Sequence, residues 1–207
     1  MCGRYVITKP VTKTVGMVKT NIKVEDLDNY NAHPSQKLPI IKSYTNGKTL
    51  ENYQWGIVPK WAKDKSNFRP LINARLETLN EKISFKKLIR KSRCIICADG
   101  YYEWKRETNK KTPYYFSRKD NKLMLFAGIF ENNQFCIITK QSSDQIKEIH
   151  DREPVLINNS QINEFLNLKK DATEFLEQVK SPILNFYTIS RDVNNPLNNN
   201  KNLIEKN

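Results

Sequence analysis

The sequence predicts an α+β fold in which one mostly antiparallel sheet is flanked by short helices. Strand-like runs follow one another through residues 93–140, and their connections are short and polar, which favours antiparallel pairing. Helical patterns are few and short. The 207 residues suit one well-buried core and leave little room for a second. We therefore expect a single domain over residues 1–193 and an Asn-rich, flexible tail over residues 194–207.

The first part of the chain combines short strands with one weak helix and a long loop. Strands are expected over residues 5–8, 38–44 and 48–55, and the weak helix over residues 11–20. The Asn46-Gly47 dipeptide between two of these strands is typical of a tight hairpin turn. Residues 59–70 are rich in lysine and show no hydrophobic periodicity. We expect them to form a long exposed loop, and such loops in compact domains are often functional.

The rest of the chain carries the remaining strands and the clearest helix signals. Strands are expected over residues 93–98, 101–106, 114–117, 122–130, 134–140 and 183–189. N-capping residues predict helices that begin at Asn80, at Ser142 or Ser143, at Ser160 and at Asp171, where Glu174 completes a capping box. The first helix is expected to run to Lys91 and to bury Ile83, Phe85 and Leu88. The second is expected to end near His150.

An excess of positive charge points to a polyanionic partner. Thirty-five lysines and arginines against 22 aspartates and glutamates give a net charge of +13 and a pI near 9.5. Nucleic acid is the most economical partner for such a charge. The alternative is compositional, because a proteome rich in lysine and asparagine raises lysine content everywhere. No apolar run approaches the roughly 20 residues of a membrane span and no signal peptide is evident, so we expect a cytoplasmic protein without a membrane partner.

The four cysteines predict neither a disulfide framework nor a metal site. A chain of this size and compartment does not need disulfides. Cys94 and Cys97 have the spacing of half a zinc site, but no second pair accompanies them and the only histidines are His33 and His150. The run from Cys94 to Ala98 is typical of a buried strand, in which residues three apart point to opposite faces. We expect no metal and no cofactor.

Cys2 follows the initiator methionine, and removal of Met1 would give it chemistry that no internal cysteine has. Removal depends on a small side chain at the next position, so we expect the mature chain to begin with Cys2. A terminal cysteine carries an α-amine with a reference pKa of about 8 and a thiol with one of about 8.5. The pair can condense with an aldehyde to a thiazolidine, or the thiol can attack a carbonyl with the amine or a histidine as base. The alternative is a small buried hydrophobic residue.

Further segments combine polar and aromatic side chains in ways that are unusual for a plain core. Glu103 lies in an aromatic strand, surroundings that raise a carboxyl pKa and suit a general acid. Each candidate has a structural alternative: Asn73 could cap a turn, Arg75 could pair with Glu77, Glu103 could face solvent, and His150 could be a cation at a helix C-terminus. Together with Cys2 they supply the nucleophile, amide, proton donor and imidazole that a carbonyl-reactive site needs.

Six motifs, in order along nearly the whole chain, resemble those of the SOS response-associated peptidase family. They are Met1-Cys2-Gly3-Arg4, Trp55-Gly56-x-x-Pro59-x-Trp61, Asn73-Ala74-Arg75-x-Glu77-Thr78, Cys97-Ala98-Asp99-Gly100-Tyr101-Tyr102-Glu103-Trp104, His150-Asp151-Arg152-x-Pro154 and Ser190-Arg191-x-Val193. The family includes abasic-site-crosslinking proteins of bacteria and a eukaryotic relative. The resemblance implies a compact α+β fold whose twisted, barrel-like sheet core is crossed by a positively charged groove for single-stranded DNA.

The resemblance also implies roles for individual residues. Cys2 matches the nucleophile that traps the aldehyde of an abasic site as a thiazolidine, and Asn73 a hydrogen-bonding orienter of the sugar. Glu103 matches the acid/base, and His150 the residue that helps to open the sugar ring. The positions implied to contact DNA are Arg4, Arg75 and Arg152 at phosphates, Trp61 and Pro34 at bases, and Thr139 as a smaller polar contact.

We therefore expect a DNA-damage protein that binds single-stranded DNA and covalently traps abasic sites as a monomer, with slow release and strand incision by β-elimination as secondary activities. The alternatives are an N-terminal-cysteine peptidase that removes its own Met1, and a non-enzymatic binder of single-stranded nucleic acid. The chain departs from the family pattern in two places. The loop between Trp61 and Pro70 is longer and more basic, with Ala62 where some members have a second tryptophan. Glu153 puts an acid beside Arg152, where we expect it to weaken a phosphate contact.

Overall fold

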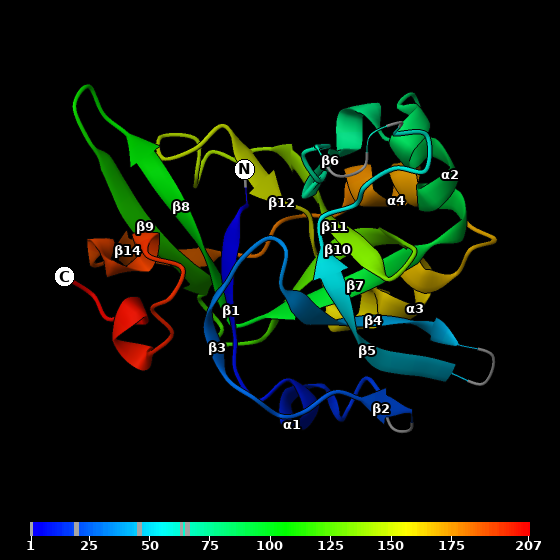
Figure 1. The fold of residues 1–207 in the computed structure, drawn as a ribbon, viewed down its shortest axis with the longest axis horizontal. Coiled ribbons are helices and arrows are strands. Elements are labelled where there is room, and N and C mark those ends of the chain that lie inside the picture. Colours follow the sequence, from blue (N-terminus) through cyan, green and yellow to red (C-terminus); the bar gives the residue numbers. More distant parts are fainter. Residues whose placement is uncertain (1, 19–20, 45–46, 63, 65–66) are drawn as a thin grey trace.

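Most of the chain folds into two twisted sheets that share one apolar core (Figure 1). The structure is a computed structural model, and it describes residues 2–18, 21–44, 47–62, 64 and 67–207. Tyr5 and Tyr101 of the smaller sheet pack their rings against Trp55 and Phe126 of the larger one, with ring centroids 5.2 to 6.1 Å apart. The predicted α+β class and the dominance of antiparallel pairing are confirmed.

The larger sheet closes into a barrel. Its strands follow the order β11-β10-β7-β4-β5 with antiparallel neighbours, and β11 also pairs with β5 in parallel, which completes the ring. The β4–β5 hairpin forms as expected, although its turn residues 45–46 lie outside the described residues. The strands of the ring are β4 (Lys37–Tyr44), β5 (Gly47–Trp55), β7 (Arg93–Ala98), β10 (Met124–Glu131) and β11 (Gln134–Gln141). The barrel-like core implied by the resemblance is therefore confirmed.

The smaller sheet is antiparallel throughout and has the order β14-β9-β8-β1-β3. Its strands are β1 (Arg4–Ile7), β3 (Asn29–Ala32), β8 (Gly100–Arg106), β9 (Lys111–Arg118) and β14 (Leu184–Thr188). The β8–β9 hairpin projects beyond the body of the domain (Figure 1).

Four short strands attach to the barrel, and short helices pack outside it. β6 and β12 flank β11, β2 pairs with β5, and β13 pairs with β10. These strands are β2 (Ile22–Lys23), β6 (Asn73–Arg75), β12 (Arg152–Pro154) and β13 (Leu156–Ile157). The helices are α1 (Pro10–Thr14), α2 (Ile83–Lys91), α3 (Ile162–Leu166) and α4 (Ala172–Gln178). Every residue of β7 is buried, because α2 and α3 cover the barrel wall there. None of the described helices has the length and apolarity that a membrane crossing requires.

The start of α2 differs from the prediction because a tertiary contact takes the capping side chain. Asn80 donates to the hydroxyl of Thr173 at 3.0 Å instead of capping the helix. The helix begins at Ile83, whose side chain is 84% exposed rather than inward. Phe85 and Leu88 are buried as expected.

Two later helices also differ in detail. Residues 144–149 form turns rather than the helix expected after Ser142 or Ser143. The 3₁₀ turn that leads into α3 starts after Asn158 rather than at Ser160, and Gln161 accepts the Asn158 N–H through its side chain. Asp171 caps α4 as predicted, since its carboxylate accepts two backbone N–H groups of the first turn.

The long loop over residues 59–70 is anchored at both ends. Ile57 and Leu71 pair as an isolated bridge, with N–H···O distances of 3.0 and 2.9 Å. Gly56 has φ of +122°, and a Cβ at this position would lie 2.8 Å from the Cβ of Pro70. A glycine is required here because the backbone has a positive φ and because Pro70, at the other end of the loop, packs against it.

The expected flexible tail is packed against the smaller sheet. Leu203 is 2% exposed and joins a small apolar cluster. The side-chain amide of Asn31, in the edge strand β3, donates to the carbonyls of Asn195 and Asn198 at 3.1 and 2.9 Å. The tail thus covers a sheet edge that would otherwise expose its polar groups. The asparagine-rich composition suggested disorder, but backbone carbonyls of the tail accept hydrogen bonds from the Asn31 side chain of β3.

Tail packing predicts a contrast between two leucines. Leu203→Ala should lower the free energy of unfolding by about 2 kcal/mol, because a buried leucine leaves a cavity. Leu197→Ala should leave it nearly unchanged, since Leu197 is 88% exposed. Urea denaturation followed by tryptophan fluorescence measures both, and equal losses would contradict the packing described.

Candidate active site

A broad cavity of about 950 Å³ opens where β6, β8 and the segment before β12 meet. The first strand of the chain, β1, pairs with β8 at this side of the domain (Figure 1). The cavity has acidic groups at Glu103 and Asp151, and more basic ones: Arg69, Arg75, Arg106, Lys111, Lys147 and Arg152. This balance favours an anionic ligand.

Cys2 is fully buried beside the cavity and is held by Asn73. The Asn73 amide group donates to the Cys2 carbonyl oxygen at 2.9 Å. Burial, and then the nearby charge of Glu103, raise the pKa of the Cys2 thiol well above its usual range. The Asn73 side-chain oxygen is buried and accepts no hydrogen bond from the described residues. It is thus an acceptor that a ligand hydroxyl could use.

Glu103 is a buried carboxyl group within the aromatic strand β8. It is 2% exposed, and burial raises its pKa to about 7. At neutral pH this group is present in both its acid and its base form. The sequence-based expectation of a desolvated general acid/base is consistent with this environment.

His150 faces Glu103 across the cavity. Its Nε2 lies 3.8 Å from the Glu103 carboxylate. Its Nδ1 accepts the Arg152 N–H at 3.0 Å and lies 2.9 Å from the exposed carboxylate of Asp151. Burial lowers the pKa of His150, while Asp151 opposes that shift. The neutral ring can therefore accept from Arg152, and the protonated ring can instead donate to Asp151.

Arg152, which the resemblance implies to contact phosphate, pairs with a different acid from the one expected. Glu77 holds its guanidinium in a bidentate pair at 2.8 Å for both contacts. Arg152 also donates to the Thr139 carbonyl at 2.8 Å. Glu153, expected to weaken Arg152, instead turns into the interior and is 2% exposed, because successive side chains of β12 point to opposite faces. The alternative pairing of Glu77 with Arg75 does not occur, and Arg75 is exposed in the cavity wall.

Other residues implied to contact DNA lie outside the cavity lining. The Arg4 guanidinium donates to the Asn31 side chain at 2.6 Å and to the carbonyl of Val193, the residue before the tail, at 2.9 Å. Trp61 is 56% exposed and packs edge-on against Phe68.

Two further positions from that set are also outside the lining. Thr139 is fully buried in β11, where its carbonyl serves Arg152. Pro34 is partly buried in the turn between β3 and β4, and its carbonyl oxygen lies 2.8 Å from His33 Nδ1. The structure therefore places Glu103, His150, Arg75 and Arg152 in the cavity lining. Cys2 and Asn73 lie next to them, since Asn73 bonds Cys2 and Glu103 is close to the Cys2 thiol. Arg4, Pro34, Trp61 and Thr139 lie outside the lining.

Several basic groups of the cavity were not predicted. Arg106 and Lys111 lie opposite each other at the end of the β8–β9 register. The short charged connection between the expected strands 101–106 and 114–117 indicated a hairpin. Only the observed pairing of β8 with β9 shows that both side chains lie at the cavity. Arg69 comes from the long loop, and Lys147 from the turns that replace the expected helix after Ser143.

The sequence and the fold both have counterparts among known proteins. The chain matches the sequence model of the family described as SOS response associated peptidase (SRAP) over residues 1–196. It is 33% identical to the abasic site processing protein YoqW of Bacillus subtilis (strain 168), with 99% of each chain covered. It is 30% identical to the abasic site processing protein YedK of Escherichia coli (strain K12), again over 99% of each. It is 30% identical to the abasic site processing protein HMCES of Mus musculus, over 83% of this chain and 63% of that protein.

Solved structures share the fold at lower identity. A crystal structure of a protein from Bacteroides thetaiotaomicron matches with a TM-score of 0.83 at 22% identity, over 100% of both chains. A phage-related protein from Bordetella bronchiseptica matches with a TM-score of 0.76 at 23% identity, over 92% of this chain and 95% of that one. The family model matches nearly the whole length of this chain, and the cysteine, amide, carboxyl and imidazole groups of the resemblance lie at or beside one cavity. The chain therefore belongs to the SOS response associated peptidase (SRAP) family.

Proposed function

We propose that this chain binds abasic sites in single-stranded DNA and traps them covalently on Cys2 once Met1 has been removed. The observation that carries the proposal is that two polar groups of the site, Asn73 and Glu103, lie next to Cys2 beside the basic cavity. Asn73 bonds the Cys2 carbonyl, and Glu103 is close enough for its charge to raise the pKa of the thiol. The relatives named above as abasic site processing proteins support the same substrate.

The chemistry needs no group beyond these residues and the substrate. The Cys2 amine adds to the aldehyde carbon of the ring-opened sugar and forms a C–N bond. Glu103 then gives a proton to the hydroxyl of this adduct, which leaves as water, and an iminium remains. The Cys2 sulfur adds to the same carbon while its proton passes to the Glu103 carboxylate. Amine, thiol and aldehyde thus become a thiazolidine and water, and Glu103 ends in its starting form.

The surroundings of the two groups suit this sequence of proton transfers. Burial disfavours the free thiolate of Cys2, so the thiol needs a base at the moment it adds. Glu103, with a pKa of about 7, can serve as acid in one step and as base in the next. In this scheme Asn73 orients the sugar through its buried, unpartnered oxygen.

His150 is assigned to the step before condensation. An abasic sugar is mostly a closed hemiacetal, and its ring must open before the amine can attack. The imidazole lies across from Glu103 and its lowered pKa keeps it largely neutral, so it can accept and return a proton. Phosphates of the strand would be bound by Arg75 and by the cavity's other free cations. Arg152 would reach them only in exchange with Glu77.

The alternative activities are distinguished by the state of the thiol and by the substrate. A cysteine peptidase requires an accessible thiolate, and burial of Cys2 opposes one. Peptide cleavage that persists without DNA would nevertheless favour the peptidase. A complex that resists denaturation only with abasic DNA excludes the non-enzymatic binder.

Substitution of Cys2 should separate trapping from binding. Cys2→Ala should abolish the denaturation-resistant complex and leave reversible binding of single strands nearly unchanged, because only the thiol is removed. Cys2→Ser should give a labile adduct, since its amine can form an imine but its hydroxyl closes the ring poorly. Denaturing gels and intact mass spectrometry measure both, and the mass also reports loss of Met1. A serine adduct as durable as that of the wild type would count against a thiazolidine.

Glu103 and His150 should affect different steps. His150→Ala should slow crosslinking and leave the final yield high, because ring opening is slower but the product is unchanged. Glu103→Gln should slow both formation and release, by about 10² to 10⁴-fold if the proton transfers are rate-limiting. Since the acid form of Glu103 is lost above about pH 7, the ratio of wild-type to Glu103→Gln rate should fall above that pH. Time courses with competitor DNA test this, and wild-type rates for both variants would show that the assignment is wrong.

Binding of undamaged single strands should be electrostatic. If about five phosphates are neutralised, log K should fall with log salt at a slope of roughly −3.5. Arg106→Ala should reduce the magnitude of that slope by about 0.7. Lys119→Ala, just after β9 at the opposite end of the β8–β9 hairpin, is the control and should not change it. Fluorescence anisotropy over a salt series measures each, and an unchanged slope for Arg106→Ala would remove that residue from the interface.

A further inference from the structure

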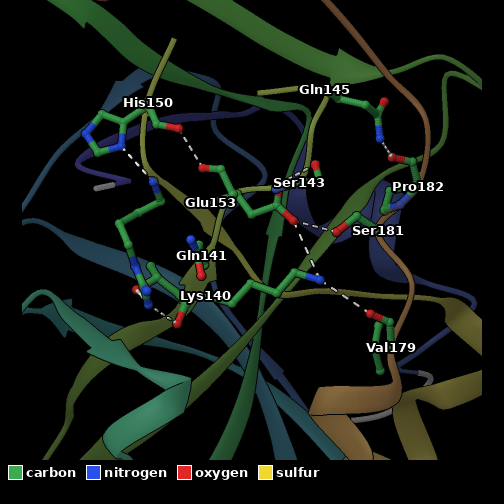
Figure 2. A network of polar contacts seen from close by, with 12 residues as sticks. Lys140, Gln141, Ser143, Gln145, His150, Glu153, Val179, Ser181 and Pro182 are labelled. Carbon is green, nitrogen blue, oxygen red and sulfur yellow. Dashed lines mark hydrogen bonds and ion pairs between the residues drawn. The ribbon is translucent and has the colours of Figure 1, made fainter. Parts of the chain in front are cut away.

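The segment that carries His150 is fastened to the domain by a buried carboxylate (Figure 2). Residues 142–151 connect β11 to β12, and only turns are found within this connection. Glu153 of β12 lies opposite Lys140 of β11 in the strand register and is 2% exposed. A connection without regular structure needs such fixed points if it is to hold a side chain in one place.

Glu153 binds both the start of this segment and a distant part of the chain. One carboxylate oxygen accepts the N–H of Ser143 at 3.1 Å and its hydroxyl at 2.8 Å. The other accepts the Ser181 hydroxyl at 2.6 Å and lies 3.6 Å from the Lys140 ammonium group. Lys140 also donates to the Val179 carbonyl at 3.4 Å. In Figure 2 these contacts converge on the carboxylate from three sides.

From Ser143 the restraint is passed on to His150 through short backbone contacts. The Ser143 carbonyl accepts the N–H of Ile146, and the Ile146 carbonyl accepts the N–H of His150 at 3.0 Å. Ser142, the neighbour of Ser143, donates through its hydroxyl to the His150 carbonyl at 2.6 Å. The histidine backbone is thus held by Ile146 and Ser142, which are themselves connected to Ser143, the residue that Glu153 binds.

We propose that Glu153 is a positioning residue for His150: through Ser143 it keeps the imidazole opposite Glu103. As far as reaction rates are concerned, this inference rests on the proposed function. An apolar side chain at position 153 could also be buried, but it would leave the Ser143 N–H and two hydroxyl groups without their acceptor. The carboxylate is therefore needed to hold the segment in place, whereas filling the apolar core does not require it.

A double-mutant cycle tests whether Glu153 acts through His150. Glu153→Gln should slow crosslinking of abasic single strands by about tenfold or more, because a small displacement of a catalytic group is costly. In a His150→Ala background the same substitution should change the rate by less than about twofold. Equal factors in both backgrounds would overturn the proposal.

The position of His150 can also be measured without any reaction. The chain has two histidines, so His33 is an internal reference in NMR titrations of labelled histidine. Among the residues that the structure describes, the charged groups facing His150 are Glu103 and Arg106 from β8 and Asp151 from its own segment. Release of the segment should raise the pKa of His150 towards its usual value. Loss of the negative charge alone would lower it, so the sign distinguishes positioning from direct electrostatics.

Matched variants keep the test decisive. Glu51→Gln removes another networked carboxylate, which contacts Lys23 and Lys42 at 3.1 and 3.2 Å. It should lower stability without changing the His150 titration or the crosslinking rate. Ser143→Ala deletes one of the hydrogen bonds to Glu153 and should shift the pKa of His150 in the same direction, less strongly, even if Glu153→Gln does not fold. If the pKa of His150 is unshifted in both Glu153→Gln and Ser143→Ala, the proposal is overturned. An inactive wild type would overturn only the proposed function.

Discussion

The pairing of strand β11 with four partners is the constraint on which the rest of the structure depends. On one side β11 pairs with β10 and then with β12, and on the other side with β5 and then with β6. The contact with β5 closes the barrel. The contacts with β6 and β12 place Asn73 and the segment of His150 on opposite flanks of one strand. Because register fixes which residues face each other, one strand both closes the core and sets the width of the site.

Desolvation sets the chemistry of the site. Cys2 and Glu103 are buried among aromatic residues, and burial raises the pKa of both groups. A thiol that resists ionisation and a carboxyl group that titrates near neutrality form a matched pair, since one needs a base and the other can be that base. His150 is shifted downwards by the same cause and stays largely neutral. The three groups thus owe their complementary states to one low-dielectric environment.

The site arginines differ in how freely they can meet a ligand. Arg75 is exposed in the cavity wall, whereas Arg152 is paired with Glu77, and Arg4 is bonded to Asn31 and Val193. An arginine already bound by a carboxylate must exchange that partner for a phosphate, which reduces the net gain from binding. The net charge of +13 therefore overstates the attraction available inside the cavity. The cations on the β8–β9 hairpin and the long loop supply part of what the paired arginines cannot.

The sequence by itself determined the fold class, most strand positions and the family, because alternation, turn dipeptides and ordered motifs are local properties. It also singled out Cys2, Asn73, Glu103 and His150, since their chemistry is unusual for a core. Tertiary structure alone decided that Asn80 hydrogen-bonds to Thr173 instead of capping a helix. It likewise decided that the asparagine-rich tail packs on β3 and that Arg152 pairs with Glu77. It also decided that Glu153 faces inward to hold Ser143. In each case a polar side chain had several possible partners, and only the distances created by long-range strand pairing selected one.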